Sequence, residues 1–289
     1  MNNHPSRQQI RAAFEAAAPG YDAVAVLQRE VADRLLERLE LLRIQPRQIL
    51  DLGCGTGYCS AALAQRYPKA RIVALDLSEA MLAHTRRRFS LWDRLRQRYA
   101  LSCGDAAQLP FADGSFDMIF SSLTLQWCAD LPRTFAELQR VLRPGGVVQF
   151  ASLGPDTLKE LRSSWASVDD AVHVNQFVDL HDVGDAMLQA GLAEPVLDME
   201  YLTLTYPDCM GLMRDLKGIG AHNHNPGRHP GLTGKRRLQK MIAAYEQFRH
   251  ADGLLPATYE LVYGHAWRGE KRKHAGSGEF QLSPDQIRR

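Results

Sequence analysis

Long apolar runs are absent from this 289-residue chain. A membrane-spanning helix needs about 18 or more consecutive apolar residues, and neither such a run nor an N-terminal apolar signal core is present. The net charge is also small, because 35 Lys and Arg face 33 Asp and Glu for a balance of +2, which does not by itself indicate nucleic-acid binding. We therefore expect a cytoplasmic protein with no membrane partner and no nucleic-acid partner.

Cysteine is scarce, and its spacing does not suit a metal. The chain has five cysteines, an odd number, and Cys54 and Cys59 have no matching distal pair. We expect reduced thiols and no metal site. Apolar residues make up 45% of the chain, which is ordinary for a globular protein with a substantial core.

The most informative segment is an apolar run, 49–52, that contains an acid and passes into Gly53, Gly55 and Gly57. This pattern is typical of a buried strand that breaks into a tight turn. Glycine is needed where a ligand lies on the backbone, since a Cβ would block its approach. Residues 58–67 then favour a helix, and a second apolar run ends in Asp76, whose carboxylate can accept hydrogen bonds from both ribose hydroxyls of a nucleoside.

The glycine spacing is G-x-G-x-G, and Tyr58 stands where a dinucleotide-binding turn would have its third glycine. NAD and FAD are therefore disfavoured, and a phosphate loop with a lysine is absent. The glycines could serve only a tight turn, but the paired acids Asp51 and Asp76 favour a nucleoside ligand. Further along, Asp105 beside Ala106 follows a third predicted strand and could bond an adenine amino group, while residues 116–121, which end in Ser121, predict a fourth.

On these residues the chain resembles the class I S-adenosylmethionine-dependent methyltransferases, an α/β superfamily with a Rossmann-like seven-stranded sheet. The resemblance implies that adenosine lies across the carboxyl ends of the parallel strands. We expect the cofactor positions to be Asp51, Gly53, Gly55, Gly57, Asp76, Leu77, Asp105, Ala106 and Ser121.

Periodicity predicts a single domain over residues 1–268, followed by a polar tail, 269–289. The resemblance implies that this domain is a methyltransferase domain. N-terminal helices span 6–42, with Tyr21 in a turn between them, and the core spans 46–155. Substrate-side helices and a helical insertion span 156–256, with one helix from Asp156, and a strand over 195–204 precedes the insertion. The last strand spans 258–267, so the insertion forms a lid before it.

A closer resemblance is carried by four segments at residues 14–29, 125–128, 173–177 and 213–221. They read FEAAAPGYD with LQR, LQWC, HVNQF and MRDLKGIGA, and they are similar to the malonyl-acyl carrier protein O-methyltransferases of biotin synthesis. The resemblance covers about residues 7 to 267, insertion included. It implies methylation of the free carboxyl of a malonyl thioester, an early step of pimeloyl formation, with S-adenosylmethionine as methyl donor.

The acceptor chemistry fits a site without a strong base. A carboxylate with a pKa of about 4 is already ionised at pH 7, whereas a carbon, phenol or amine acceptor needs a base poised near neutrality. The resemblance implies catalytic roles for Tyr21, Gln126 and Trp127. It implies that Lys217, His222 or Arg228 orients the malonyl carboxylate or the thioester carbonyl.

The expected partner is an acyl carrier protein, and its acidity predicts a basic docking face. Lys235, Arg236, Arg237 and Lys240 could supply that face, or could form an ordinary solvated helix surface. Two alternatives stay open at this point. Residues 156–162 and 255–259 are also similar to a methyltransferase-like assembly factor of respiratory complex I, which acts on a protein side chain, and the chain could instead bind S-adenosylmethionine without turnover.

Overall fold

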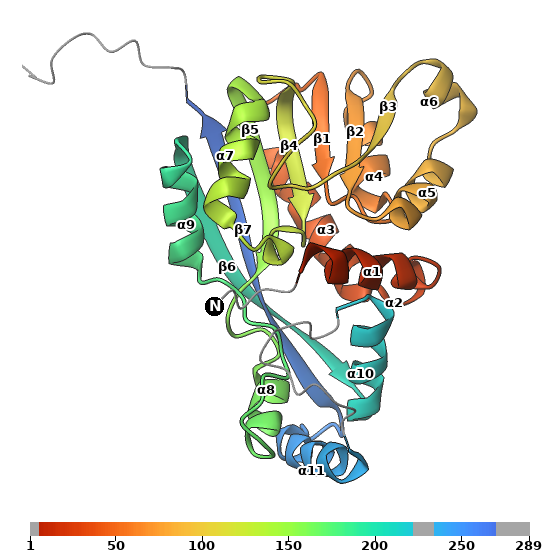
Figure 1. Ribbon diagram of the computed structural model, residues 1–289, viewed down its shortest axis with the longest axis vertical. Helices are drawn as coiled ribbons and strands as arrows, with labels where there is room; N and C mark the ends of the chain where they lie inside the picture. The colour runs from red at the N-terminus through yellow and green to blue at the C-terminus, as the bar shows by residue number, and fades with distance from the viewer. Residues whose placement is uncertain (1–5, 222–233, 270–289) are drawn as a thin grey trace, which may run out of the picture.

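The computed structural model describes residues 6–221 and 234–269. Its centre is one seven-stranded sheet with the order β3-β2-β1-β4-β5-β7-β6 (Figure 1). The strands are β1 (Gln48–Leu52), β2 (Arg71–Asp76), β3 (Tyr99–Cys103), β4 (Phe116–Ser122), β5 (Leu142–Leu153), β6 (Leu192–Tyr206) and β7 (Leu255–Arg268). Strands β1 to β5 pair in parallel, and β7 is antiparallel to both β5 and β6.

Helices cover both faces of the sheet. They are α1 (Arg7–Ala17), α2 (Tyr21–Val24), α3 (Val26–Glu37), α4 (Tyr58–Arg66), α5 (Glu79–Arg88), α6 (Leu91–Leu95), α7 (Leu131–Val141), α8 (Lys159–Ala166), α9 (Leu180–Gln189), α10 (Cys209–Gly218) and α11 (Lys235–Tyr245). Short 3₁₀ turns occur at η1 (Arg38–Leu41), η2 (Leu125–Trp127) and η3 (Glu246–Phe248). None of these described helices is long and apolar enough to cross a bilayer.

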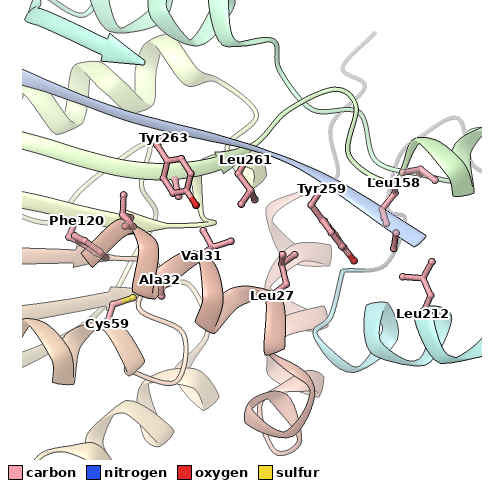
Figure 2. Packing of buried hydrophobic residues seen from close by; sticks show 14 of the residues in the cluster. Leu27, Val31, Ala32, Cys59, Phe120, Leu158, Leu212, Tyr259, Leu261 and Tyr263 are labelled. Atoms are coloured by element: carbon pink, nitrogen blue, oxygen red, sulfur yellow. The ribbon is translucent and has the colours of Figure 1, made fainter. Parts of the chain in front are cut away.

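Most of the core falls into two apolar clusters, one on each face of the sheet, and a small third cluster is formed by Cys54, Ala74 and Leu82. Along β4 the side chains alternate from Met118 on, so that Met118 and Phe120 join one cluster while Ile119 joins the other. Phe116 lies in the cluster of Ile119, because the register shifts between Phe116 and Met118. Figure 2 shows how α3 and β7 meet in the first cluster. Burial on both faces explains why these strands read as nearly continuous apolar runs.

Strands β6 and β7 continue past the end of β5. Leu261 of β7 pairs with Leu153, the last residue of β5, while the β6–β7 ladder runs on to Tyr206 and Leu255. The free edge of β7 is covered by the start of α8, where Leu158 N donates to Thr258 O at 2.6 Å. Helices α8, α10 and α11 gather around this extension (Figure 1).

The predicted architecture is confirmed, including the helical insertion between the last two strands. Four boundary predictions were wrong. Tyr21 begins the short helix α2 instead of lying in a turn, and α8 starts at Lys159, since the chain from 154 to 158 is pinned to β7 first. Strands β6 and β7 are longer than expected, because they pair with each other beyond the rest of the sheet.

Gly264 lies in β7 between β5 and β6 and offers a test of the packing. A Cβ there would overlap the side chains of Phe150 and Leu197. We expect Gly264→Ala to lower the free energy of unfolding by about 1–3 kcal/mol through overpacking, as measured by urea denaturation. Gly234→Ser is the control, because nothing lies within 4 Å of a Cβ at that site. Equal stability of the two variants would contradict this account of the packing.

Candidate functional site

A cavity of about 650 Å³ lies at the carboxyl ends of β1, β2, β3 and β4. We call it the glycine-loop cavity. The strand order reverses between β1 and β4, and open α/β sheets bind ligands at this position. Its walls include the predicted residues Gly53, Gly55, Asp76, Leu77, Asp105 and Ala106.

The glycine loop has the backbone that its sequence requires. Gly53 and Gly55 have φ angles of 71° and 54°, in the left-handed region that favours glycine. A Cβ on Gly53 would overlap Thr124, whereas a Cβ on Gly55 would meet nothing within 4 Å. The space beside Gly55 is therefore open, as close approach of a ligand to the backbone requires.

Asp76 joins the loop to the end of β2. Its Oδ2 accepts a hydrogen bond from Gly55 N at 2.9 Å, and its Oδ1 accepts one from Ser78 N at 2.8 Å. Burial raises the pKa of Asp76 above its usual value, although these backbone donors oppose the shift. Each oxygen keeps a second lone pair, so the carboxylate can still accept bonds from ribose hydroxyls.

Asp105 is covered by the N-terminal helix α1. Its Oδ2 lies 3.0 Å from Arg7 Nη2, and its Oδ1 accepts from Ala107 N at 3.0 Å. The side chain of Arg7 is 64% exposed, so this ion pair is weak and can be displaced by a ligand. Helix α1 also places Ile10 and Phe14 on the cavity wall, a contribution that the sequence analysis missed.

Three predicted cofactor residues lie behind the wall. The carboxylate of Asp51 is buried and accepts a hydrogen bond from Ser60, and burial raises its pKa to about 7. Gly57 forms the N-cap of α4, and Ser121 donates to Leu52 O at 3.1 Å. They support the loop, while the neighbouring Ser122 lines the cavity.

A second chamber, of about 90 Å³, adjoins the first. Phe14, Tyr21, Leu123 and Trp127 line both spaces and so form the boundary between them. Phe14 and Trp127 meet edge to face, with ring centroids 5.4 Å apart. The predicted residue Gln126 lines the second chamber but does not line the glycine-loop cavity.

Tyr21 is held as a neutral phenol. Burial raises its pKa well above the usual value, and the nearby Asp76 carboxylate adds to the shift. A hydroxyl that stays protonated serves as a hydrogen-bond donor and not as a base.

The predicted substrate residues are not brought together by the described part of the chain. Lys217 is exposed in the last turn of α10 and lines neither cavity, although Leu216 and Ile219 beside it line the second chamber. His222 and Arg228 lie outside the described residues. Ala221, the last described residue before them, lines the second chamber.

The four basic residues of the proposed docking face lie on α11, and all are exposed. Arg237 is not free, because its Nη1 lies 3.9 Å from Asp169 Oδ2. In the described part of the chain no group of three or more His, Cys, Asp or Glu residues could hold a metal ion.

A polar clamp holds α2, and with it Tyr21, against the glycine loop. Asp22 Oδ1 accepts from Thr56 Oγ1 at 2.6 Å, and Asp22 Oδ2 accepts from Arg88 Nη2 at 2.7 Å. Arg88 Nε also donates to Thr56 O at 2.7 Å. The clamp joins α2, the glycine loop and α5, elements that lie far apart in the sequence.

The fold and the site define a class I methyltransferase. A family model described as a methyltransferase domain matches residues 49–146. A solved structure of a methyltransferase from Bacillus halodurans C-125 superposes with a TM-score of 0.58, covering 82% of this chain and 100% of that chain at 17% identity, a likeness of fold alone.

Curated relatives narrow the class. The chain is 52% identical to the malonyl-[acyl-carrier protein] O-methyltransferase of Gallionella capsiferriformans (strain ES-2), over 92% of each chain. It is 50% identical to the protein of the same name from Methylovorus sp. (strain MP688), over 98% of this chain and 95% of that one. The chain belongs to the malonyl-acyl carrier protein O-methyltransferase family.

The clamp predicts that Asp22→Asn weakens the binding of S-adenosylmethionine about three- to tenfold, since α2 loses its charged partner at Arg88. Isothermal titration calorimetry measures the affinity. Asp33→Asn is the matched control. Asp33 is exposed on the neighbouring helix α3, and its carboxylate accepts a hydrogen bond from the hydroxyl of Tyr58. An unchanged affinity in Asp22→Asn would mean that α2 keeps its place without the clamp.

Proposed function

We propose that this protein transfers a methyl group from S-adenosylmethionine to the free carboxyl of malonyl-acyl carrier protein. The product is the methyl ester, whose formation is an early step of pimeloyl synthesis for biotin. The observation that carries the proposal is the sequence identity of 50–52% to curated members of the family, over 92–98% of this chain. Two adjoining cavities that share a boundary, one suited to a nucleoside and one smaller, support it.

The residues of the glycine-loop cavity fit the methyl donor. S-adenosylmethionine supplies an activated methyl group on a sulfonium. The open space beside Gly55 leaves room for the ligand, and Gly53 lets the loop turn tightly against Thr124. Asp76 accepts from the ribose, and Asp105 accepts from the adenine amino group. Asp51, Gly57 and Ser121 contribute indirectly, by fixing the loop and the strand ends.

The acceptor needs positioning more than it needs activation. A malonyl carboxylate is ionised at neutral pH, so the transfer needs no base. Leu123 and Trp127, between the two cavities, exclude water from the line of approach. Tyr21 donates a hydrogen bond through its neutral hydroxyl at the same boundary, and Gln126 offers its amide from the side of the second chamber.

The malonyl-binding roles of His222 and Arg228 remain predictions, since both lie outside the described residues. The role of Lys217 becomes less direct, because its side chain is exposed outside the chamber walls. Lys217 is instead placed to contact the surface of the acyl carrier protein that carries the malonyl group. Among the alternatives, a complex I assembly factor is not favoured by the curated relatives. A methyl-transfer assay distinguishes an enzyme from a module that binds S-adenosylmethionine without turnover.

A methyl-transfer assay tests the function. Labelled S-adenosylmethionine and malonyl-acyl carrier protein should give a labelled, base-labile ester, because only the malonyl form carries a free carboxylate. The acetyl-acyl carrier protein is the control and should take up no label. Transfer to neither carrier protein would favour a module that binds S-adenosylmethionine without turnover. Transfer to a protein side chain would favour the complex I assembly factor.

We also propose that the exposed basic residues of α11 dock the acidic carrier protein. The double change Lys235→Glu and Arg236→Glu should raise the KM for malonyl-acyl carrier protein about tenfold or more at low salt, with the KM for malonyl-coenzyme A unchanged. The matched control is Arg86→Glu with Arg87→Glu, an exposed basic pair at the end of α5. If the α5 pair alone raises the KM, the docking face lies there.

A further inference from the structure

The second chamber contains a histidine that is fixed from two sides. His173 lines the chamber, and its Nε2 lies 2.7 Å from Asp169 Oδ1. Its ring stacks on Trp165, with centroids 3.7 Å apart and planes 7° from parallel. The side chains of His173 and Asp169 are only 15% and 20% exposed. With Nε2 and one ring face engaged, Nδ1 is the ring atom left to meet a ligand.

His173 is also distinctive by charge. Among the described residues that line the chamber there is no Lys, Arg, Asp or Glu, so His173 is the lining side chain that can become a cation. Most of the other walls are apolar, for example Leu27, Leu158 and Leu161. A carboxylate that enters such a space loses water and needs a donor in return.

Asp169 is equipped to hold the ring. Its Oδ1 also accepts from Ala171 N at 3.1 Å, and Arg237 lies 3.9 Å from its Oδ2. The hydrogen bond from His173 holds the pKa of Asp169 below its usual value, so the carboxylate stays ionised and accepts Nε2–H. With Nε2–H directed at Asp169, the imidazolium form of the ring has its second N–H, at Nδ1, to donate to an anion.

We infer that His173 is a substrate-binding residue, whose imidazolium Nδ1–H donates to the malonyl carboxylate in the second chamber, and that Asp169 and Trp165 are its positioning residues. The inference rests on the proposed function and names the group that selects its substrate. A single donor occupies one carboxylate oxygen and leaves the other free to attack the methyl group, whereas a bidentate guanidinium would engage both. The methyl ester product carries no charge for the imidazolium, so the same contact favours substrate over product.

The test compares malonyl-acyl carrier protein as substrate with acetyl-acyl carrier protein as competitive inhibitor. His173→Gln should raise the KM for the malonyl form about 10- to 100-fold, since a hydrogen bond to a charged group is lost. The inhibition constant of the acetyl form should change less than about twofold, because that ligand has no carboxylate. Asp169→Asn should shift the malonyl KM in the same direction by a smaller factor, with His173 still in place.

Two controls separate this role from folding. The affinity for S-adenosylmethionine should be unchanged in both variants, because neither residue lines the glycine-loop cavity. His181→Gln is the matched change, since His181 pairs with Asp179 at 3.0 Å but is 89% exposed and lines neither cavity. If His173→Gln loses affinity for S-adenosylmethionine, the malonyl KM of Asp169→Asn tests the inference in its place.

The inference is overturned by a malonyl KM within twofold of wild type, or by equal losses for the malonyl and acetyl forms. An unchanged KM would mean that another group binds the malonyl carboxylate. Equal losses for the two forms would mean that His173 has a structural role. Wild-type protein that transfers no methyl group to malonyl-acyl carrier protein would instead refute the proposed function. The two failures are therefore distinguishable.

Discussion

The attachment of the glycine loop to the end of β2 is the constraint on which the rest of the site depends. Gly53 N and Cys54 N both donate to Leu75 O, at 2.7 and 2.9 Å, and Gly55 N donates to Asp76 Oδ2. These bonds require the loop to turn tightly beside β2, so two neighbouring strand ends share one wall. Because Asp76 already accepts from the loop, the carboxylate is oriented before a ligand arrives, and less ordering is left for the binding step.

Charge is divided between the two cavities in a way that suits a cationic donor and an anionic acceptor. The wall of the glycine-loop cavity carries charges of both signs, Asp76, Asp105 and Asp130 with Arg7 and Arg133, and its acids favour a sulfonium. The described walls of the second chamber carry no fixed charge. Tyr21 stands between them and stays neutral, so it can donate to the acceptor without competing for the methyl group.

The sequence was sufficient for the features that arise from local pattern. The alternation of glycines after residues 49–52 and the acid at the end of the next apolar run located the loop and Asp76, because turn geometry and strand ends are local properties. Arg7, Thr124 and His173 could not be placed this way, since each reaches its cavity by long-range packing. Ser121 lies behind the wall that Ser122 lines. Side chains alternate along β4, so a difference of one residue decides which of them faces the cavity.

The same limit explains why substrate recognition is harder to derive than cofactor binding. The shared sheet fixes the donor site, but the second chamber is built from short pieces of many elements. They include the N-terminal helices, the 123–127 turn, residues 157–161 at the start of α8, the 173–177 segment and residues 216–221 at the end of α10. A chain of polar contacts crosses this region, from Arg237 on α11 to Asp169 and then to His173 on the chamber wall. A carrier protein that docks on α11 would meet the outer end of that chain while its acyl group meets the inner end. Surface recognition thus depends on the insertion that carries α11, and carboxylate recognition depends on the segment before β6 that carries Asp169 and His173. The fold alone specifies neither segment.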